Sequence, residues 1–297
     1  MTATLPTTSA ERWTAWHVVA ATALAVFGVL VTLDAWQDIF HIATVDEENS
    51  HIFLVPVVAV WMVWVRRARF RHTKPVGTVI GPLLAGVGWA VASYGYYHKF
   101  QSLWHGGSVL VALGCALAVL GRQVFFRFFP AILVLGFLVP VPGVIRLQIA
   151  QPLQVWTSQV TEIALTMIGQ DVERSGNLLT VNGQPVNIVE ACNGLRMVFA
   201  LVLVSYAFSF GLPLRNWVRI LVLLASPIAA IFCNVVRILP TVWLYGVADQ
   251  KWGSLFHDYS GWLMLPIAFL ILLGIIKALQ WAMIPVMRYT LASQEQV

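Results

Sequence analysis

The sequence predicts an all-α integral membrane protein with about eight transmembrane helices, an amphipathic helix on the outer face and a small β-hairpin before the sixth span. Composition is the first reason: 59% of the 297 residues are hydrophobic and 10% are charged, whereas a soluble domain carries roughly 25% charged residues. The second is the recurrence of apolar runs of about 20 residues, the length with which a helix crosses the hydrocarbon core. The third is the content of 13 Trp and 7 Tyr, because both side chains favour the membrane–water interface.

Apolar segments of spanning length recur along the chain, which we expect to form a single polytopic membrane domain over residues 1–297. The candidate spans are 17–36, 51–65, 76–97, 103–121, 129–145, 194–211, 217–239 and 260–286. The second is short and extends back toward Asn49, and Pro140 and Pro142 are expected to kink or end the fifth. The first is too long for the core of a signal peptide, so we expect it to remain as an anchor.

The basic residues predict the orientation of these spans. They cluster before the first span, after the second, fourth and sixth, and at the end of the eighth: Arg12, Arg66, Arg67, Arg69, Arg71, Lys74, Arg122, Arg127, Arg215, Arg219, Lys277 and Arg288. The positive-inside rule makes their side cytoplasmic. An even number of spans then places both termini in the cytoplasm. Because topology explains the net charge of +5, we expect no nucleic-acid partner.

The segment 146–192 is the long connection on the opposite, outer face. Within it, Gln148–Ile168 has apolar residues at three- and four-residue spacing, which is typical of an amphipathic helix lying along the interface. A further, partly polar membrane helix is the alternative. Asn182-Gly183 between β-forming residues predicts a hairpin. That hairpin would deliver Glu190 and Cys192 to the start of the sixth span.

Cys192 is the first candidate for chemistry. The other two of the 3 cysteines, Cys115 and Cys233, lie inside apolar runs, and the wide spacings argue against a disulfide framework or a zinc site. A thiol at the start of a helix meets the positive end of the helix dipole, which favours the thiolate. Glu190, Asn193 and Arg196 make its surroundings polar, whereas a small buried structural thiol is the plain alternative.

Arg237 and His257 are the next candidates, and both fall on the outer side. Arg237 ends an apolar run with Asn234 three residues earlier on the same helix face, and it can either bind a developing oxyanion or snorkel to lipid phosphate. His257 precedes the eighth span, where an imidazole can take a thiol proton and later protonate a leaving amine, or can be a plain interfacial residue. With Cys192 they supply the groups that acyl transfer through a thioester requires.

Histidines on the outer side raise the question of a metal. None of His41, His51, His98 and His105 has the spacing of metal ligands, so we expect neither metal nor cofactor. His51 follows Asn49-Ser50 at the start of the second span. It is a candidate to line the same cavity as Cys192, with an interfacial cap as the alternative.

Three stretches in this order resemble the exosortase/archaeosortase family. They are Glu190-Ala191-Cys192-Asn193-Gly194-Leu195-Arg196, Asn234-Val235-Val236-Arg237, and His257 at the head of the last span. Ser50–Pro56 and 169–189 extend the resemblance over most of the chain. It implies a polytopic membrane cysteine protease and transpeptidase that cleaves C-terminal sorting signals made of a short motif (Pro-Glu-Pro in one bacterial class), a membrane helix and a basic tail. By this resemblance Cys192 is the nucleophile, Arg237 binds the substrate or its oxyanion, and His257 is the third catalytic residue.

The resemblance also sets expectations for location and partners. Archaeal relatives can carry arginine where His257 stands, so we expect a bacterial inner-membrane exosortase with its site facing the periplasm. Asn193 stands where many members have serine, and the chain ends soon after the last span, as in a short form without a fused C-terminal domain. The expected partners are membrane-anchored proteins with a sorting signal, the lipid bilayer, and a glycan or lipid acceptor.

Two other functions fit the same composition. A polytopic transporter also carries intramembrane charges and Pro-interrupted helices, although no pair of such helices occurs in two similar halves of this sequence. A non-catalytic scaffold of surface polysaccharide export is the second. Transport should survive loss of the Cys192 thiol. A scaffold should keep full function in His257→Ala, and a thiol-reactive probe should not label its Cys192 selectively.

Overall fold

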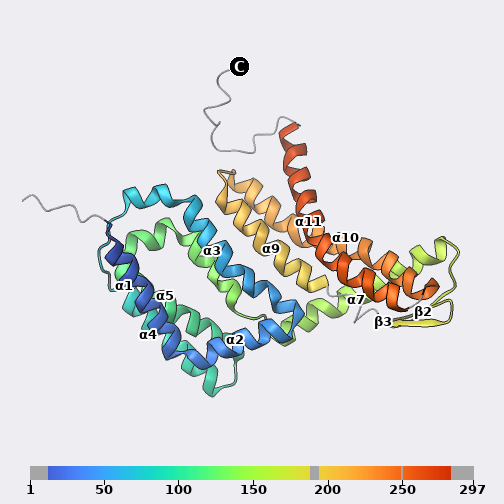
Figure 1. Cartoon of the computed structure of the whole chain (residues 1–297), viewed down its shortest axis with the longest axis horizontal. Coiled ribbons are helices and arrows are strands. Elements are labelled where there is room, and N and C mark those ends of the chain that lie inside the picture. Colours follow the sequence, from blue (N-terminus) through green and yellow to red (C-terminus); the bar gives the residue numbers. More distant parts are fainter. Residues whose placement is uncertain (1–12, 188–193, 249, 282–297) are drawn as a thin grey trace, which may run out of the picture. The chain divides into compact units, whose positions relative to one another are not determined.

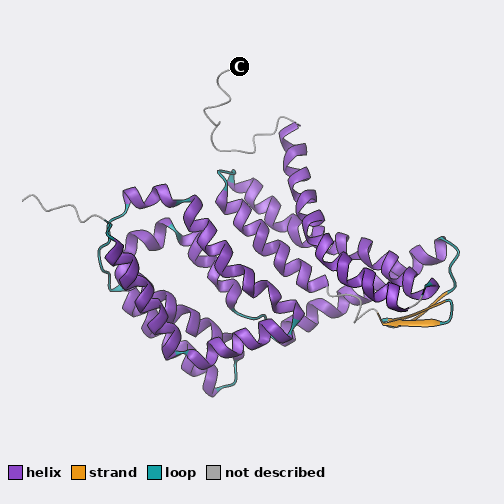
Figure 2. Ribbon diagram, viewed as in Figure 1, coloured by secondary structure: helices purple, strands orange, loops and turns teal. Residues whose placement is uncertain are grey.

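A computed structural model describes residues 13–187, 194–248 and 250–281. The described chain is mostly helical, with one small sheet (Figures 1 and 2). It divides into two compact units, Met1–Ile42 with Ile52–Pro140, and Ala43–His51 with Val141–Val297. The expected single membrane domain over 1–297 stays a prediction.

The first unit is built around a helical hairpin. Its elements are α1 (Ala15–Val31), α2 (Leu33–Val45, which ends beyond the unit), α3 (Leu54–Val65), α4 (Ile80–Tyr97), α5 (Gln101–Arg127), α6 (Phe129–Leu133) and the 3₁₀ helices η2 (Arg67–His72) and η3 (Val134–Leu138). Helices α4 and α5 run antiparallel and pack through glycine, since a Cβ atom at Gly88 would lie 2.8 Å from the Gly107 carbonyl oxygen. Small residues allow such close approach between membrane helices.

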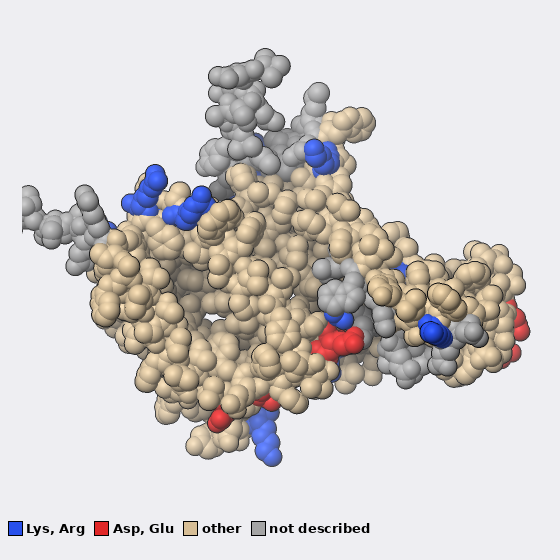
Figure 3. Space-filling view, in the orientation of Figure 1, with Lys and Arg blue, Asp and Glu red and all other residues tan. Residues whose placement is uncertain are grey.

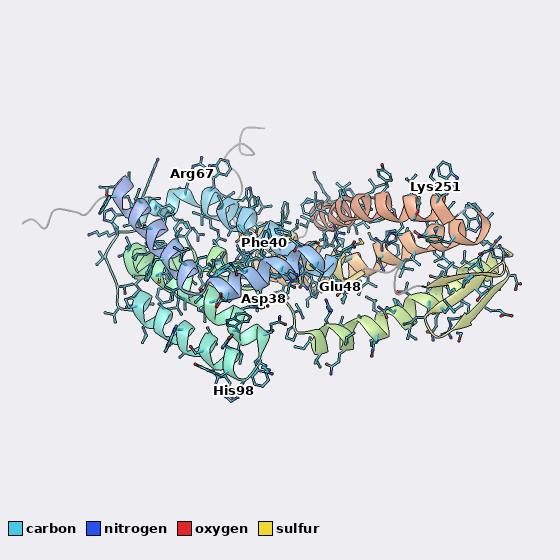
Figure 4. The ribbon with its side chains drawn as sticks, turned by 60° about the horizontal axis from the view of Figure 1, so that its bottom comes forward. Asp38, Phe40, Glu48, Arg67, His98 and Lys251 are labelled. Carbon is cyan, nitrogen blue, oxygen red and sulfur yellow. The ribbon has the colours of Figure 1, made fainter. Side chains whose placement is uncertain are left out.

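Charged groups sort to the two ends of the first unit. At one end Arg69 Nη1 donates to the Arg127 carbonyl oxygen at 2.8 Å, so the basic residues that follow the second and fourth predicted spans lie together. At the other end Asp38 accepts hydrogen bonds from His105 and Gln101, each at 2.9 Å. Figure 4 shows Arg67 and His98 at opposite ends of this unit. The clustering expected within this unit is therefore present.

The second unit is an assembly of long helices with a sheet at one end. Its elements are the 3₁₀ helix η1 (Glu47–Phe53, which ends beyond the unit), α7 (Gly143–Met167), β1 (Val172–Ser175), β2 (Leu178–Val181), β3 (Gln184–Asn187), α9 (Gly194–Gly211), α10 (Asn216–Val247) and α11 (Gln250–Trp281). Helix α10 lies between α9 and α11 and packs on both (Figure 1). Met197, Leu201, Ala230 and Leu272 are buried where the three helices meet.

The predicted hairpin is confirmed as β2 and β3, and β1 extends it to a three-stranded antiparallel sheet. Asn182 and Gly183 form its turn with φ of 50° and 80°, the left-handed values of a two-residue type I′ turn. Val181 and Val186 are buried against Ile238 of α10. The sheet is therefore fixed to α10, and β3 ends five residues before Cys192.

Helix α7 confirms a helix over the predicted amphipathic segment and begins five residues earlier, at Gly143. Its predicted apolar stripe is exposed: Trp156 is 57% and Met167 is 81% accessible. The face buried within the unit instead carries small and hydroxyl side chains, including Thr157 and Thr161. The stripe therefore faces away from the protein, as expected of a surface in contact with lipid.

The predicted count of eight spans is not confirmed. Within the described chain, the helices that are long and apolar enough to cross a membrane are Glu47–Val65, Gln101–Arg127, Gly194–Gly211 and Asn216–Val247, and three bent pairs raise the number from 4 to as many as 7. The predicted span 76–97 is helical as α4, but its glycines and tyrosines lower its hydropathy and it is not among them. Charged side chains interrupt the visible surface at only a few places (Figure 3). The protein is membrane-embedded, with several apolar helices.

Candidate functional site

The candidate site is built on the second unit, where α9 begins. Glu190, Cys192 and Asn193 lie outside the described residues. The described chain stops at Asn187, at the end of β3, and resumes at Gly194, the first residue of α9. The residues around this gap define the site as far as the structure describes it.

Arg237 lies inside α10 with 4% of its surface accessible. Its Nη2 donates a hydrogen bond to Asn234 Oδ1 at 3.1 Å, and Asn234 is 1% accessible. The two side chains meet because residues three apart share a helix face. Asn234 is uncharged, so this bond orients the guanidinium without neutralising it. The prediction that Asn234 and Arg237 share a helix face is confirmed.

Two glycines bring the neighbouring helices against this pair. A Cβ atom at Gly194 would lie 2.8 Å from Asn234 Nδ2, and one at Gly261 would lie 3.2 Å from Arg237 Nη1. Both distances are shorter than ordinary van der Waals contact. The first residue of α9 and the middle of α11 therefore touch the Asn234–Arg237 pair from two sides, and a larger residue at either glycine would displace it.

His257 lies on α11, one helical turn before Gly261. Residues four apart lie on the same face of a helix, so His257 is on the α11 face that adjoins Arg237. Its side chain is half-buried, and Ser260 Oγ donates to the His257 carbonyl oxygen at 3.2 Å. This face of α11 packs on α10, because Gly261 lies against Arg237.

His51 and Arg196 lie beside the first turns of α9. The His51 side chain is 5% accessible, and its ring centroid is 5.2 Å from that of Phe199. Its Nδ1 donates to the Glu48 carbonyl oxygen at 3.1 Å. Arg196 Nη1 lies 3.4 Å from Glu47 Oε2. Both predicted supporting residues therefore adjoin the start of α9, although their described contacts are with η1 and α9 and not with Arg237.

Arg146 also belongs to this region, although it was not among the site residues predicted from the sequence. It forms ion pairs with Asp46 and with Glu48, the latter at 3.2 Å between Nε and Oε2; Glu48 is labelled in Figure 4. Asn49 Nδ2 donates to the same Asp46 carboxylate at 3.0 Å. The ion pairs tie the start of α7 to the turn that carries His51. The signal in the sequence was an arginine at the start of the predicted outer segment 146–192, away from the basic clusters of the cytoplasmic side.

Within the described part of the chain, no group of three or more His, Cys, Asp or Glu side chains is placed to hold a metal ion. The buried polar side chains beside the start of α9 include an amide and a guanidinium, Asn234 and Arg237. These groups can hold an anion or polarise a carbonyl oxygen.

Comparison with known proteins identifies the family of the chain. The model of the transmembrane exosortase family (Exosortase_EpsH) matches residues 36–274. The chain belongs to this family. The match begins in α2, ends in α11 and includes all residues of the candidate site. Neither the curated proteins nor the solved structures that were compared with this exosortase gave a match.

Proposed function

We propose that this exosortase is a cysteine peptidase and transpeptidase that cleaves the C-terminal sorting signal of membrane-anchored proteins. The observation that carries the proposal is the convergence of Gly194, Asn234, Arg237 and Gly261. Cys192 is two residues from Gly194, and two peptide units reach at most about 7 Å. That short tether supports a thiol working beside the guanidinium.

The sheet adds a second constraint on the nucleophile. It packs on α10 through Val181 and Val186 beside Ile238, the residue that follows Arg237. The segment from β3 to α9 is therefore anchored to α10 at both of its ends. Such an anchor favours a preorganised site beside Arg237.

The chemistry follows from the three groups. The Cys192 thiolate attacks the carbonyl carbon at the scissile bond, and Arg237 stabilises the oxyanion that forms. His257, which takes the proton of the Cys192 thiol, gives that proton to the departing amine as the C–N bond breaks, which leaves a thioester on Cys192. Water, or a hydroxyl of a glycan or lipid acceptor, then loses a proton to His257 as its oxygen attacks the thioester and displaces the thiolate. Hydrolysis and transfer share all steps up to that last one.

The surroundings fit a substrate that is itself anchored in the membrane. Exposed apolar side chains lie along α10 and α11, including Ile228, Phe232 and Leu263. A substrate helix can pack there, so that most of the binding energy comes from the helix and the small polar site selects the motif. We place the site on the periplasmic side of a bacterial inner membrane, with both termini in the cytoplasm, on the basis of the distribution of basic residues.

The test is intact-mass analysis of a sorting-signal protein co-expressed with wild-type enzyme or with Cys192→Ala. We expect Cys192→Ala to abolish cleavage while its level in the membrane stays that of wild type. Cys115→Ala is the matched control, because Cys115 lies in the first unit, and it should cleave normally. The mass of the product identifies the bond cut and any acceptor added. Normal processing by Cys192→Ala would refute the mechanism.

A further inference from the structure

A cavity of about 590 Å³ lies in the first unit, apart from the candidate site. Its walls come from α1, α5 and η2, and nearly all of its lining is apolar. This volume is within the range of about 300–1,000 Å³ that is typical of small-molecule sites. The cavity is large enough for a ligand, and the residues around it indicate which kind.

Small side chains create the apolar part of the cavity. Ala21 and Ala25 lie one turn apart on α1 and face Ala116 of α5 across the hollow. Farther along, the two helices touch directly, because a Cβ atom at Gly28 would lie 2.8 Å from Ala112 Cα. The cavity is therefore a groove between α1 and α5, and it ends where these two helices pack closely together. A groove lined by methyl groups on a membrane helix suits a hydrocarbon chain.

The other end of the groove is held in a fixed shape by an indole. Trp13 Nε1 donates to the Thr73 carbonyl oxygen at 3.0 Å and lies 3.1 Å from Thr73 Oγ1. Its ring packs edge-on against Phe70 at 5.3 Å between centroids. Trp with its N–H bonded and its ring on an apolar surface is typical of the depth where acyl chains meet headgroups.

Arg71 is the charged residue that lines this end. Two other arginines of η2 are engaged within the protein: Arg67 lies over the Trp64 ring at 4.6 Å, and Arg69 donates to the Arg127 carbonyl oxygen. Arg71 is exposed and, among the described residues, has no ion pair. A guanidinium on an exposed rim can bind a phosphate by two parallel hydrogen bonds.

We propose that this groove binds an anionic phospholipid, with an acyl chain between α1 and α5 and the phosphate at Arg71. The basic residues of the two connecting loops lie at this end of the unit, so its potential favours an anionic headgroup. A basic peptide tail is disfavoured at the same place by like charge. The site is independent of the proposed cleavage reaction.

The test is native mass spectrometry of the purified full-length protein in detergent, with phosphatidylglycerol or phosphatidylcholine of identical acyl chains. We expect the wild-type protein to retain one phosphatidylglycerol with about tenfold preference over phosphatidylcholine. Arg71→Gln should remove that preference. Arg67→Gln is the matched control on the same 3₁₀ helix and should keep it.

A second pair of variants tests the groove itself. Ala25→Trp fills the hollow and should abolish retention of both lipids, whereas Val26→Trp, on an exposed neighbouring position of α1, should not. Thr22→Phe, at an exposed position that lines the groove, serves if Ala25→Trp does not fold. Undiminished preference in Arg71→Gln, or equal retention in the filled and control variants, would overturn the proposal. The proposal would also be overturned if inorganic phosphate, or a peptide that co-purifies with the protein, displaced the bound lipid.

Discussion

Asn234 Oδ1 accepts a hydrogen bond from Arg237 Nη2 at 3.1 Å, while its Nδ2 faces the backbone of Gly194 so closely that a Cβ there would lie 2.8 Å away. One buried amide thus links the arginine of α10 to the first residue of α9. We expect this amide to set the orientation of the guanidinium in the proposed cleavage reaction.

Replacement of this amide tests that role. Asn234→Ala leaves the guanidinium without the bond that orients it, so we expect cleavage to fall about 10- to 100-fold, the effect of losing a hydrogen bond to a charged group. Asn234→Asp adds a negative charge that competes for Arg237, and we expect at least the same loss. Both effects should appear mainly in kcat, measured as the rate of signal cleavage in membranes.

Thr241→Val is the control for that prediction. Thr241 Oγ1 donates to the Arg237 carbonyl oxygen at 2.7 Å, so the variant removes a bond to the same residue but not to its guanidinium. We expect cleavage within a factor of about two of wild type. If Asn234→Ala cleaves as well as Thr241→Val, the amide does not position the arginine.

A second prediction compares two glycines of α11. Gly261→Ala places a methyl group 3.2 Å from Arg237 Nη1, whereas Gly274→Ala meets nothing within 4 Å. The gain in helix propensity is the same for both, about 0.5–1 kcal/mol. We expect Gly274→Ala to raise the melting temperature and cleave normally, and Gly261→Ala to lose about tenfold in cleavage through a shift of the guanidinium. Equal activity of the two variants would contradict the assigned contact.

The parts of this structure that local sequence determines were predicted correctly. The Asn182-Gly183 turn needs only its own two residues to adopt positive φ, and Asn234 meets Arg237 because a helix places residues three apart together. The helix over the apolar stripe of α7 was also predicted, but the periodicity of a sequence does not determine whether such a stripe faces protein or lipid.

Features that depend on distant segments were not predicted. Strand β1 has the polar sequence Val172-Glu173-Arg174-Ser175 and becomes a strand only by pairing with β2. The partners of Arg146, Asp46 and Glu48, are about 100 residues away in the sequence. The contact of Gly261 with Arg237 likewise depends on how α10 and α11 pack, which no local pattern encodes. The count of spans was not predicted either, because three helix pairs of the described chain are bent by more than 40° at short breaks.

A third prediction concerns the sheet as an anchor. A Cβ atom at Gly246 would lie 2.4 Å from Val181 Cγ1, and Val181 is fully buried. Gly246→Ala should therefore push β2 away from α10 and reduce cleavage, with a faster proteolytic cut in the sheet as the structural readout. Val181→Ala removes the nearest clashing atom, so the double variant should recover part of the activity. No difference between Gly246→Ala and wild type in either assay would show that the sheet does not need this contact.

The last prediction concerns Arg146, whose side chain is 28% accessible and which pairs with Asp46 and Glu48, themselves 29% and 20% accessible. Arg146→Gln removes the cation and leaves two neighbouring carboxylates partly buried, which we expect to destabilise the fold by about 1–3 kcal/mol. The melting temperature in detergent measures this effect. Removing both carboxylates as well, in Arg146→Gln with Asp46→Asn and Glu48→Gln, eliminates the repulsion and should restore most of the stability.

The comparison of those two variants also tests the support of His51. Asn49 bonds to Asp46, and His51 bonds to the Glu48 carbonyl oxygen, so loss of the cation should loosen the turn that packs His51 on Phe199. Cleavage should then fall with stability in Arg146→Gln and recover in the triple variant, because the turn regains its shape without charge. If the triple variant is stable but cleaves no better than Arg146→Gln, the charge of Arg146 has a direct part in catalysis and its role is not to hold the turn. If Arg146→Gln is as stable as wild type, the ion pairs contribute nothing to the fold.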